Sequence, residues 1–161
     1  MREIPLTQGK VALVDDEDFE EISKYKWCAS KGSRNCHTYY AVRGYRNHGS
    51  SVTESMHRRV MGFKGHIDHI DGNGLNNQRE NLREATSTQN MRNRHPRFKS
   101  TSSLKGVGLF RGKWRARIFL NGKETHLGVF NTEKEAGLAY DLAARKYFGE
   151  FAWLNSNHNL I

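Results

Sequence analysis

Residues 65–94 read GHIDHIDGNGLNNQRENLREATSTQNMRNR, and this stretch decides the fold that we expect for the middle of the chain. Residues 65–70 have the composition of a strand, and the Gly- and Asn-rich loop of residues 71–77 ends it because such residues favour turns. Residues 82–86 are long enough for a returning strand. Thr86 offers an N-cap for a helix, so the stretch predicts a compact ββα unit.

Polar side chains lie at fixed places in this unit. Asp68 and His69 are adjacent near the end of the first strand, and Asn90 lies on the helix. The helix is expected to end before Pro96, because a proline ring excludes the α-helical region for the residue before it. The arrangement indicates a candidate site.

These residue types suit hydrolysis of a phosphodiester with one divalent metal ion. Asp68 and Asn90 offer hard oxygen ligands for Mg²⁺ (or Mn²⁺), an ion that keeps several waters for a substrate phosphate. His69 can take a proton from an attacking water, because histidine ordinarily titrates near neutral pH. Successive strand residues point to opposite faces, so Asp68 and His69 can serve one centre only if the strand twists or ends there.

Two structural alternatives stay open for the same residues. Residues 71–73 hint at a calcium loop, although the EF-hand pattern of alternating acids with a terminal Glu is absent. Asp68, His69 and Asn81 could instead only stabilise turns. Turn chemistry, however, requires neither His69 nor Asn90.

Composition points to a basic protein with a polyanionic partner. The 161 residues carry a formal net charge of +9, with an excess of +1 over residues 1–52, +4 over 53–100 and +4 over 101–161. Basic surface of this kind is typical of nucleic-acid binding. No stretch suits a membrane span, and the N-terminus lacks the apolar core of a secretion signal, so we expect a soluble protein of the reducing cytoplasm.

The two cysteines, Cys28 and Cys36, have a spacing that fits neither a CxxC motif nor a disulfide framework. We therefore expect two free thiols. A zinc ion shared with His37 is the weaker alternative, because a structural zinc site requires four ligands.

The N-terminal third is expected to be rich in β-strand, at residues 4–7, 10–14 and 39–42, with a supporting helix over residues 15–26. Residues 53–61 predict a second short helix that ends at Gly62. It carries Arg58 and Arg59, which could contact phosphates. It also carries His57, which we interpret as a packed or surface residue rather than a ligand.

A run without acidic residues follows the middle stretch. Residues 91–103 contain Arg92, Arg94, Arg97 and Lys99. The run is either a solvated linker or a basic tether that lies along DNA, and the two interpretations are compatible.

Residues 104–161 predict a second small domain. Three strands are expected at residues 107–111, 114–120 and 125–130, with Asn121-Gly122 as a hairpin turn. Thr132 and Glu135 predict a capping box at the start of an amphipathic helix that Gly149 ends. The domain is therefore a three-stranded antiparallel sheet packed on one helix.

Alternation along the middle strand of this sheet divides its side chains between two faces. One face packs on the helix and carries Trp114, Ala116, Ile118 and Leu120. The other is basic and open, with Lys113, Arg115, Arg117 and Phe119. A sheet with arginines can lie in the DNA major groove, where guanidinium groups read guanine edges and contact phosphates.

With Asp68-His69, Asn81 and Asn90 in this order, the middle stretch resembles the HNH, or ββα-metal, nuclease motif in its His-Asn-Asn form, as found in homing endonucleases of phages and bacteria. The resemblance implies that His69 is the general base, that Asp68 and Asn90 bind the metal, and that Asn81 braces the loop so that His69 is held in place. It also implies 5′-phosphate and 3′-hydroxyl products and an intracellular, phage- or bacteria-encoded enzyme.

Residues 105–155, with KGV, KWRARI, LGVF, EAGLAYDLAA and AWLN in that order, resemble the ethylene-response-factor DNA-binding domain of plant transcription regulators. The resemblance implies a groove-facing surface formed by Lys105, Arg115, Arg117, Phe119 and His126. Gly108, Phe119 and Glu124 stand where that family usually has basic residues. Only DNA binding, and not the plant-type base specificity, is therefore carried over.

We expect an α+β protein with an HNH nuclease domain at residues 1–95 (ββα-metal motif 65–95), a basic linker at 96–103 and a DNA-binding domain at 104–161. The first hypothesis is a metal-dependent homing-type endonuclease that cleaves double-stranded DNA as a monomer or homodimer, with no membrane and no obligatory protein partner. The alternative is a non-catalytic, sequence-specific DNA-binding regulator. The residues expected to contact DNA are Arg58, Arg59, Arg92, Arg94, Arg97, Lys99, Lys105, Arg111, Lys113, Arg115, Arg117, Phe119 and His126.

Overall fold

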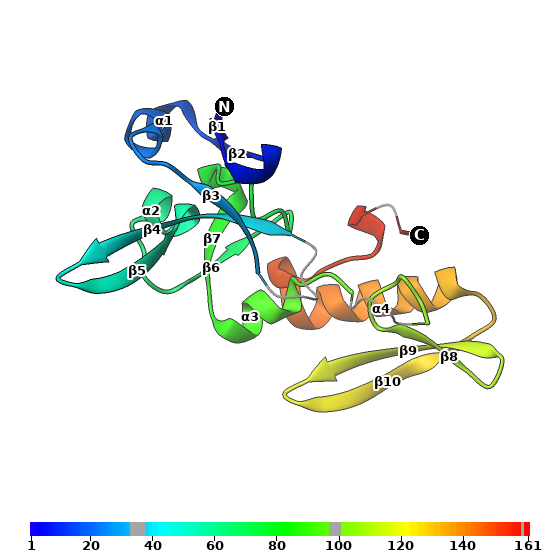
Figure 1. The fold of residues 1–161 in the computed structure, drawn as a ribbon. Coiled ribbons are helices and arrows are strands. Elements are labelled where there is room, and N and C mark those ends of the chain that lie inside the picture. The colour runs from blue at the N-terminus through cyan, green and yellow to red at the C-terminus, as the bar shows by residue number, and fades with distance from the viewer. Residues whose placement is uncertain (33–37, 97–100, 159) are drawn as a thin grey trace. The chain divides into compact units, whose positions relative to one another are not determined.

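The computed structural model describes residues 1–32, 38–96, 101–158 and 160–161. The chain divides into two compact units, Met1–Asn90 and Met91–Ile161. Both units combine antiparallel sheet with helices, so the α+β class expected from the sequence is confirmed (Figure 1). No helix in the described part of the chain is long and apolar enough to cross a membrane.

The first unit begins with a two-stranded sheet and a short helix. Strands β1 (Arg2–Pro5) and β2 (Val11–Val14) pair antiparallel, and α1 (Asp16–Ser23) follows. The helix is shorter than the predicted 15–26 because Lys24 already caps it. Its first turn is acidic, which suits the partly positive end of a helix.

A three-stranded antiparallel sheet comes next, with the order β3 (Cys28–Lys31), β4 (Tyr39–Asn47) and β5 (Ser50–Ser55). The helix predicted over residues 53–61 is wrong at its start, because residues 53–55 belong to β5 and α2 spans Met56–Met61. Residues 50–55 pair with β4 across a turn at His48 and Gly49, which both have positive φ. Pairing with a neighbouring strand outweighs the local helical pattern here.

The predicted ββα unit is present. Strand β6 (His66–His69) pairs antiparallel with β7 (Leu82–Ala85), and α3 (Ser87–Arg92) follows. Thr86 caps α3 as expected, because its hydroxyl accepts from the Gln89 backbone N–H while the Gln89 side chain accepts from the Thr86 N–H. Strand β6 ends at His69, which meets the condition under which Asp68 and His69 can serve one centre.

One core holds the elements of the first unit together. Its buried members come from most elements of the unit and are Ile4, Ala12, Val14, Ile22, Trp27, Ala41, Met56, Val60, Ile67 and Leu82. Ile67 and Leu82 bring β6 and β7 into this core, whereas Met56 and Val60 anchor α2 to it. The candidate catalytic strand and helix α2 are therefore fixed to the same apolar centre.

The second unit is the sheet-and-helix domain predicted from the sequence. Strands β8 (Val107–Phe110), β9 (Lys113–Leu120) and β10 (Lys123–Phe130) form an antiparallel sheet, and α4 (Glu133–Phe148) follows. Thr132 and Glu135 form the expected capping box. Asn121 and Gly122 both have positive φ, as a tight hairpin turn requires. Gly106 is required by packing, because a Cβ there would lie 2.0 Å from the Tyr140 ring.

Candidate active site

Asp68 lies on β6 and is buried, with 4% of its surface exposed. Its direct cross-strand neighbour on β7 is Arg83. The Arg83 guanidinium donates to Asp68 Oδ2 from Nε at 2.9 Å and from Nη2 at 2.6 Å. This ion pair compensates the cost of burying the carboxylate.

His69 ends β6 and is 6% exposed. Its ring packs against Tyr40 of β4 and His57 of α2, with centroids 5.8 and 5.1 Å away. Burial lowers the pKa of His69, while the Asn77 side chain and the carboxylates of Asp71 and Asp68 act in the opposite direction. A neutral imidazole at neutral pH is the state that a general base requires.

Asn90 reaches the same strand from α3. Its side-chain Nδ2 donates to the backbone carbonyl of Ile67, the residue before Asp68, at 3.4 Å. An amide that donates through nitrogen keeps its oxygen as an acceptor or a metal ligand. The structure thus brings the Asn90 side chain to the part of β6 that carries Asp68 and His69.

Asn81 closes the loop between β6 and β7. Its Oδ1 accepts from the Asp71 backbone N–H at 3.0 Å, and its Nδ2 donates to Asp71 Oδ1 at 2.9 Å and to the Asn76 carbonyl at 2.8 Å. The Ile70 N–H also donates to the Asn81 carbonyl. These bonds fix the chain directly after His69.

The loop also docks on β4. The Gly74 N–H donates to the Thr38 hydroxyl at 2.7 Å, and a Cβ at Gly74 would lie 2.6 Å from both the Tyr39 carbonyl and the Tyr40 ring. Glycine is therefore needed for this close approach. Asp71 accepts hydrogen bonds from the Asn73 N–H and the Asn76 amide, so it acts within the loop.

The donor set for a metal ion is small. Asp68 supplies a carboxylate and Asn90 an amide oxygen, which suits a hard ion that keeps most of its waters. No three His, Cys, Asp or Glu side chains cluster as a metal site within the described ranges. Cys28 is an exposed free thiol, whereas Cys36 and His37 lie outside the described residues.

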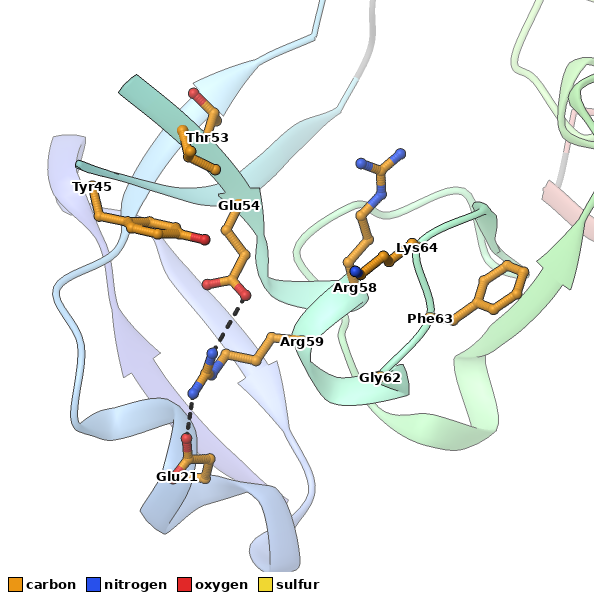
Figure 2. Close-up of a pocket in the computed structure, with 10 residues that line it drawn as sticks. Glu21, Tyr45, Thr53, Glu54, Arg58, Arg59, Gly62, Phe63 and Lys64 are labelled. Atoms are coloured by element: carbon orange, nitrogen blue, oxygen red, sulfur yellow. Dashed lines mark hydrogen bonds and ion pairs between the residues drawn. The ribbon is translucent and has the colours of Figure 1, made fainter. Parts of the chain in front are cut away.

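The two arginines of α2 differ in their surroundings (Figure 2). Arg59 points to Glu54 and Glu21, forms ion pairs with both, and donates to the Tyr25 hydroxyl at 2.8 Å. Arg58 points away from this cluster. Arg58 and Lys64 line a hollow of about 560 Å³, and neither forms an ion pair with another described residue. Arg58 is therefore available to an anion, whereas Arg59 already has carboxylate partners.

The residues of the expected tether have local contacts where the structure describes them. The Arg92 guanidinium lies 4.6 Å from the centre of the Phe148 ring. Lys105 Nζ donates to the carbonyls of Arg92 and Arg94, both at 2.6 Å, which gives Lys105 a role within the second unit. Arg97 and Lys99 lie outside the described residues.

The open face of the second sheet has the predicted alternation. On β9, Ala116 and Ile118 are buried, whereas Phe119 is 57% exposed. Arg117 lies opposite His126 in the sheet and forms an ion pair with Glu124 at 2.7 Å. The guanidinium groups of Arg111 and Arg115 flank the exposed Phe110 ring, at 5.3 and 5.2 Å from its centre, and Lys113 is exposed at the start of the strand. Cations and apolar side chains thus alternate on this surface.

Comparison with known proteins identifies the first unit. A family model described as HNH endonuclease matches residues 64–92, the segment that contains Asp68, His69, Asn81 and Asn90. An uncharacterized HNH endonuclease of Acanthamoeba polyphaga mimivirus is 34% identical over 147 residues, which cover 90% of this chain and 74% of that protein. The chain belongs to the HNH endonuclease family.

Plant transcription factors match a smaller part of this HNH protein. The AP2-like ethylene-responsive transcription factor ANT of Arabidopsis thaliana is 38% identical over 71 residues, and APETALA2-like protein 2 of Oryza sativa subsp. indica is 42% identical over 66 residues. The chain spans only 13% and 15% of their lengths. The resemblance to a plant DNA-binding domain that the sequence suggested is thereby supported.

Two residues that contact the candidate site were not assigned to it from the sequence. Arg83 faces Asp68, and the strand register could have revealed it, since any antiparallel pairing of residues 66–69 with 82–85 brings the two together. His57 packs on His69, but α2 and β6 are joined only by tertiary structure, and no local pattern indicates this contact.

Proposed function

We propose that this HNH endonuclease cleaves double-stranded DNA by metal-dependent hydrolysis, with His69 as the general base and with Asp68 and Asn90 as the ligands of one divalent ion, Mg²⁺ or Mn²⁺. The observation that carries the proposal is the hydrogen bond from Asn90 to the Ile67 carbonyl, which brings an amide from α3 to the strand of Asp68 and His69. Carboxylate and amide oxygens are the ligands that such ions prefer.

In the proposed reaction His69 accepts a proton from a water molecule, whose oxygen attacks the phosphorus of the scissile linkage. The bond from phosphorus to the 3′ oxygen breaks, so the products carry a 5′-phosphate and a 3′-hydroxyl, and a solvent water protonates the leaving oxygen. A bound divalent ion would stabilise negative charge on the phosphate and on the leaving oxygen. Asn81 supports the reaction by fixing the loop directly after His69.

DNA contacts are proposed on both units. Arg58 and Lys64 line the hollow beside α2 and are suited to bind backbone phosphates. Arg111, Lys113, Arg115, Arg117, Phe119 and His126 belong to the sheet of the second unit and are suited to a groove. Arg59 and Lys105 are left out because their charged groups already have partners within the chain, whereas Arg117 is kept because its ion pair with Glu124 is exposed. Arg92, Arg94, Arg97 and Lys99 remain a predicted basic tether that lies along DNA.

One observation favours the alternative, a non-catalytic DNA-binding regulator. The Asp68 carboxylate is ion-paired with Arg83, as a purely structural carboxylate would be. The nuclease assignment requires Asp68 Oδ1, which accepts neither of these two bonds, to bind the metal.

Plasmid cleavage distinguishes the two functions. Purified wild-type protein with Mg²⁺ or Mn²⁺ is expected to nick or linearise supercoiled plasmid, and EDTA is expected to abolish this reaction. His69→Ala should fold like wild type and should slow cleavage at least about 100-fold. Cleavage by His69→Ala at the wild-type rate would overturn the base assignment. DNA binding by the wild-type protein without cleavage in either ion would establish the regulator.

A further inference from the structure

Three rings from separate elements meet around the proposed base. Tyr40 comes from β4, His57 from α2 and His69 from β6. The ring planes of His57 and His69 are perpendicular, with centroids 5.1 Å apart. Tyr40 lies 6.1 Å from the His57 ring and 5.8 Å from the His69 ring, also edge to face. Perpendicular packing of this kind constrains the orientation of both rings.

The backbone that carries His57 is firmly held. Helix α2 is only six residues long, but Met56 and Val60 on either side of His57 are buried in the core of the first unit. Gly62 in the left-handed conformation ends the helix. His57 therefore presents its ring to His69 from a fixed position.

His57 is not suited to exchange protons itself. Burial, with the nearby His69 and Arg58 as smaller causes, lowers the pKa of His57 to about 3, so its imidazole stays neutral. Its Nδ1 is buried and has no hydrogen-bond partner among the described residues.

We propose that His57 is a positioning residue for the nuclease reaction: its ring packs against the imidazole of His69 and keeps that imidazole in the orientation from which it accepts the proton of the attacking water. The inference rests on the proposed role of His69. It adds a residue that lies outside the matched family segment, which begins at residue 64. The contact that the structure records is a perpendicular packing of the two rings.

Two substitutions of His57 separate the ring from its nitrogens. His57→Phe retains an aromatic ring, and His57→Leu fills similar space without one. We expect His57→Leu to lower kcat for plasmid cleavage by roughly 10- to 100-fold, because small misplacement of a catalytic group has effects of this size. The KM for DNA should change less than about 2-fold, and His57→Phe should retain kcat within about 3-fold. His48→Asn, at an exposed histidine in the β4–β5 turn, is the matched control and should behave as wild type.

A spectroscopic measurement accompanies the kinetics. The ¹⁵N and ¹H resonances of the His69 ring should shift or broaden in His57→Leu and stay near their wild-type positions in His57→Phe, while thermal melting verifies that both variants fold. Wild-type kcat in His57→Leu, or a loss in His57→Phe as large as in His57→Leu, would overturn the inference. His69→Ala is assayed in parallel to distinguish the two proposals. Full activity of His69→Ala contradicts the assignment of His69 as the base. If His69→Ala is inactive and His57→Leu is fully active, only the role of His57 is contradicted.

Discussion

Arg83 on β7 lies directly opposite Asp68 on β6, and its guanidinium holds one oxygen of that carboxylate through two hydrogen bonds. The side chains are 12% and 5% exposed, so the pair is largely withdrawn from water. The carboxylate proposed as a metal ligand is thus neutralised and oriented by the chain itself. The same ion pair therefore affects the stability of the β6–β7 strand pair and the orientation of the proposed metal ligand.

The ion pair makes Arg83 important for stability. Arg83→Leu removes this guanidinium from a buried carboxylate and is expected to lower the free energy of unfolding by about 3–5 kcal/mol. Urea denaturation measures the loss, and the double variant Asp68→Asn, Arg83→Leu should recover most of it because no charge stays buried. A change below about 0.5 kcal/mol in Arg83→Leu would show that Asp68 does not depend on this partner.

Asn81 is expected to support both stability and activity. Asn81→Ala removes three hydrogen bonds of a side chain that is 7% exposed. The Asp71 N–H and the Asn76 carbonyl then lose their partner, so the free energy of unfolding should fall by about 1–3 kcal/mol. Cleavage should slow because the loop after His69 is no longer fixed. Urea denaturation and plasmid cleavage test this. If Asn81→Ala is as stable and as active as wild type, the side chain of Asn81 is not needed to fix the loop.

The free energy of unfolding is expected to depend on pH through His57. Its pKa is lowered from 6.5 to about 3 by burial, so the folded state favours the neutral ring. Between pH 6.5 and 3 the unfolded chain binds a proton at His57 that the folded chain does not bind. The free energy of unfolding is therefore unaffected by His57 above pH 6.5 and falls as the pH is lowered toward 3, by at most about 1.4 kcal/mol per pH unit. Denaturation across this range should show a shallower loss in His57→Phe than in wild type. Parallel curves for the two proteins would contradict the burial of a neutral His57.

Glu124 restrains Arg117 on the open sheet face of the second unit. The pair is exposed, so Glu124→Gln should change the free energy of unfolding by less than about 1 kcal/mol. With Arg117 released, the affinity for non-specific DNA should rise. The slope of log affinity against log salt concentration should become steeper by up to about 0.9 for each added phosphate contact. Fluorescence anisotropy at several salt concentrations measures both quantities. Glu80→Gln makes the same charge change on the first unit, and an equal effect of the two substitutions would argue against the sheet as the DNA surface.

Much of the fold follows from local sequence signals. The loop of residues 71–77, the cap at Thr86, the turn at Asn121-Gly122 and the capping box at Thr132 each specify a structure within a few residues, and each is found where expected. The β6–β7–α3 unit and the second domain depend on such signals. Their prediction therefore needed no knowledge of distant contacts.

The remaining features depend on partners far away in sequence. Strand β5 is polar and has no alternating apolar pattern, so only its pairing with β4 defines it. From the sequence, Arg59 is expected to contact phosphate. In the folded chain its guanidinium lies beside Glu21, which is 38 residues away in the sequence. Lys105 likewise donates to carbonyls of the preceding segment, a contact that its own sequence neighbourhood does not indicate. A side chain's type can be read from sequence, but its partner cannot.

The central claim is that Asp68 and Asn90 hold a divalent ion beside His69, and Mn²⁺ binding followed by electron paramagnetic resonance tests it most directly. Wild type and His69→Ala should bind Mn²⁺ with similar affinity, whereas Asp68→Asn and Asn90→Ala should bind it at least about 10-fold more weakly. All three variants should cleave plasmid at least about 100-fold more slowly than wild type. Unchanged Mn²⁺ affinity in folded Asp68→Asn or Asn90→Ala protein would contradict the account.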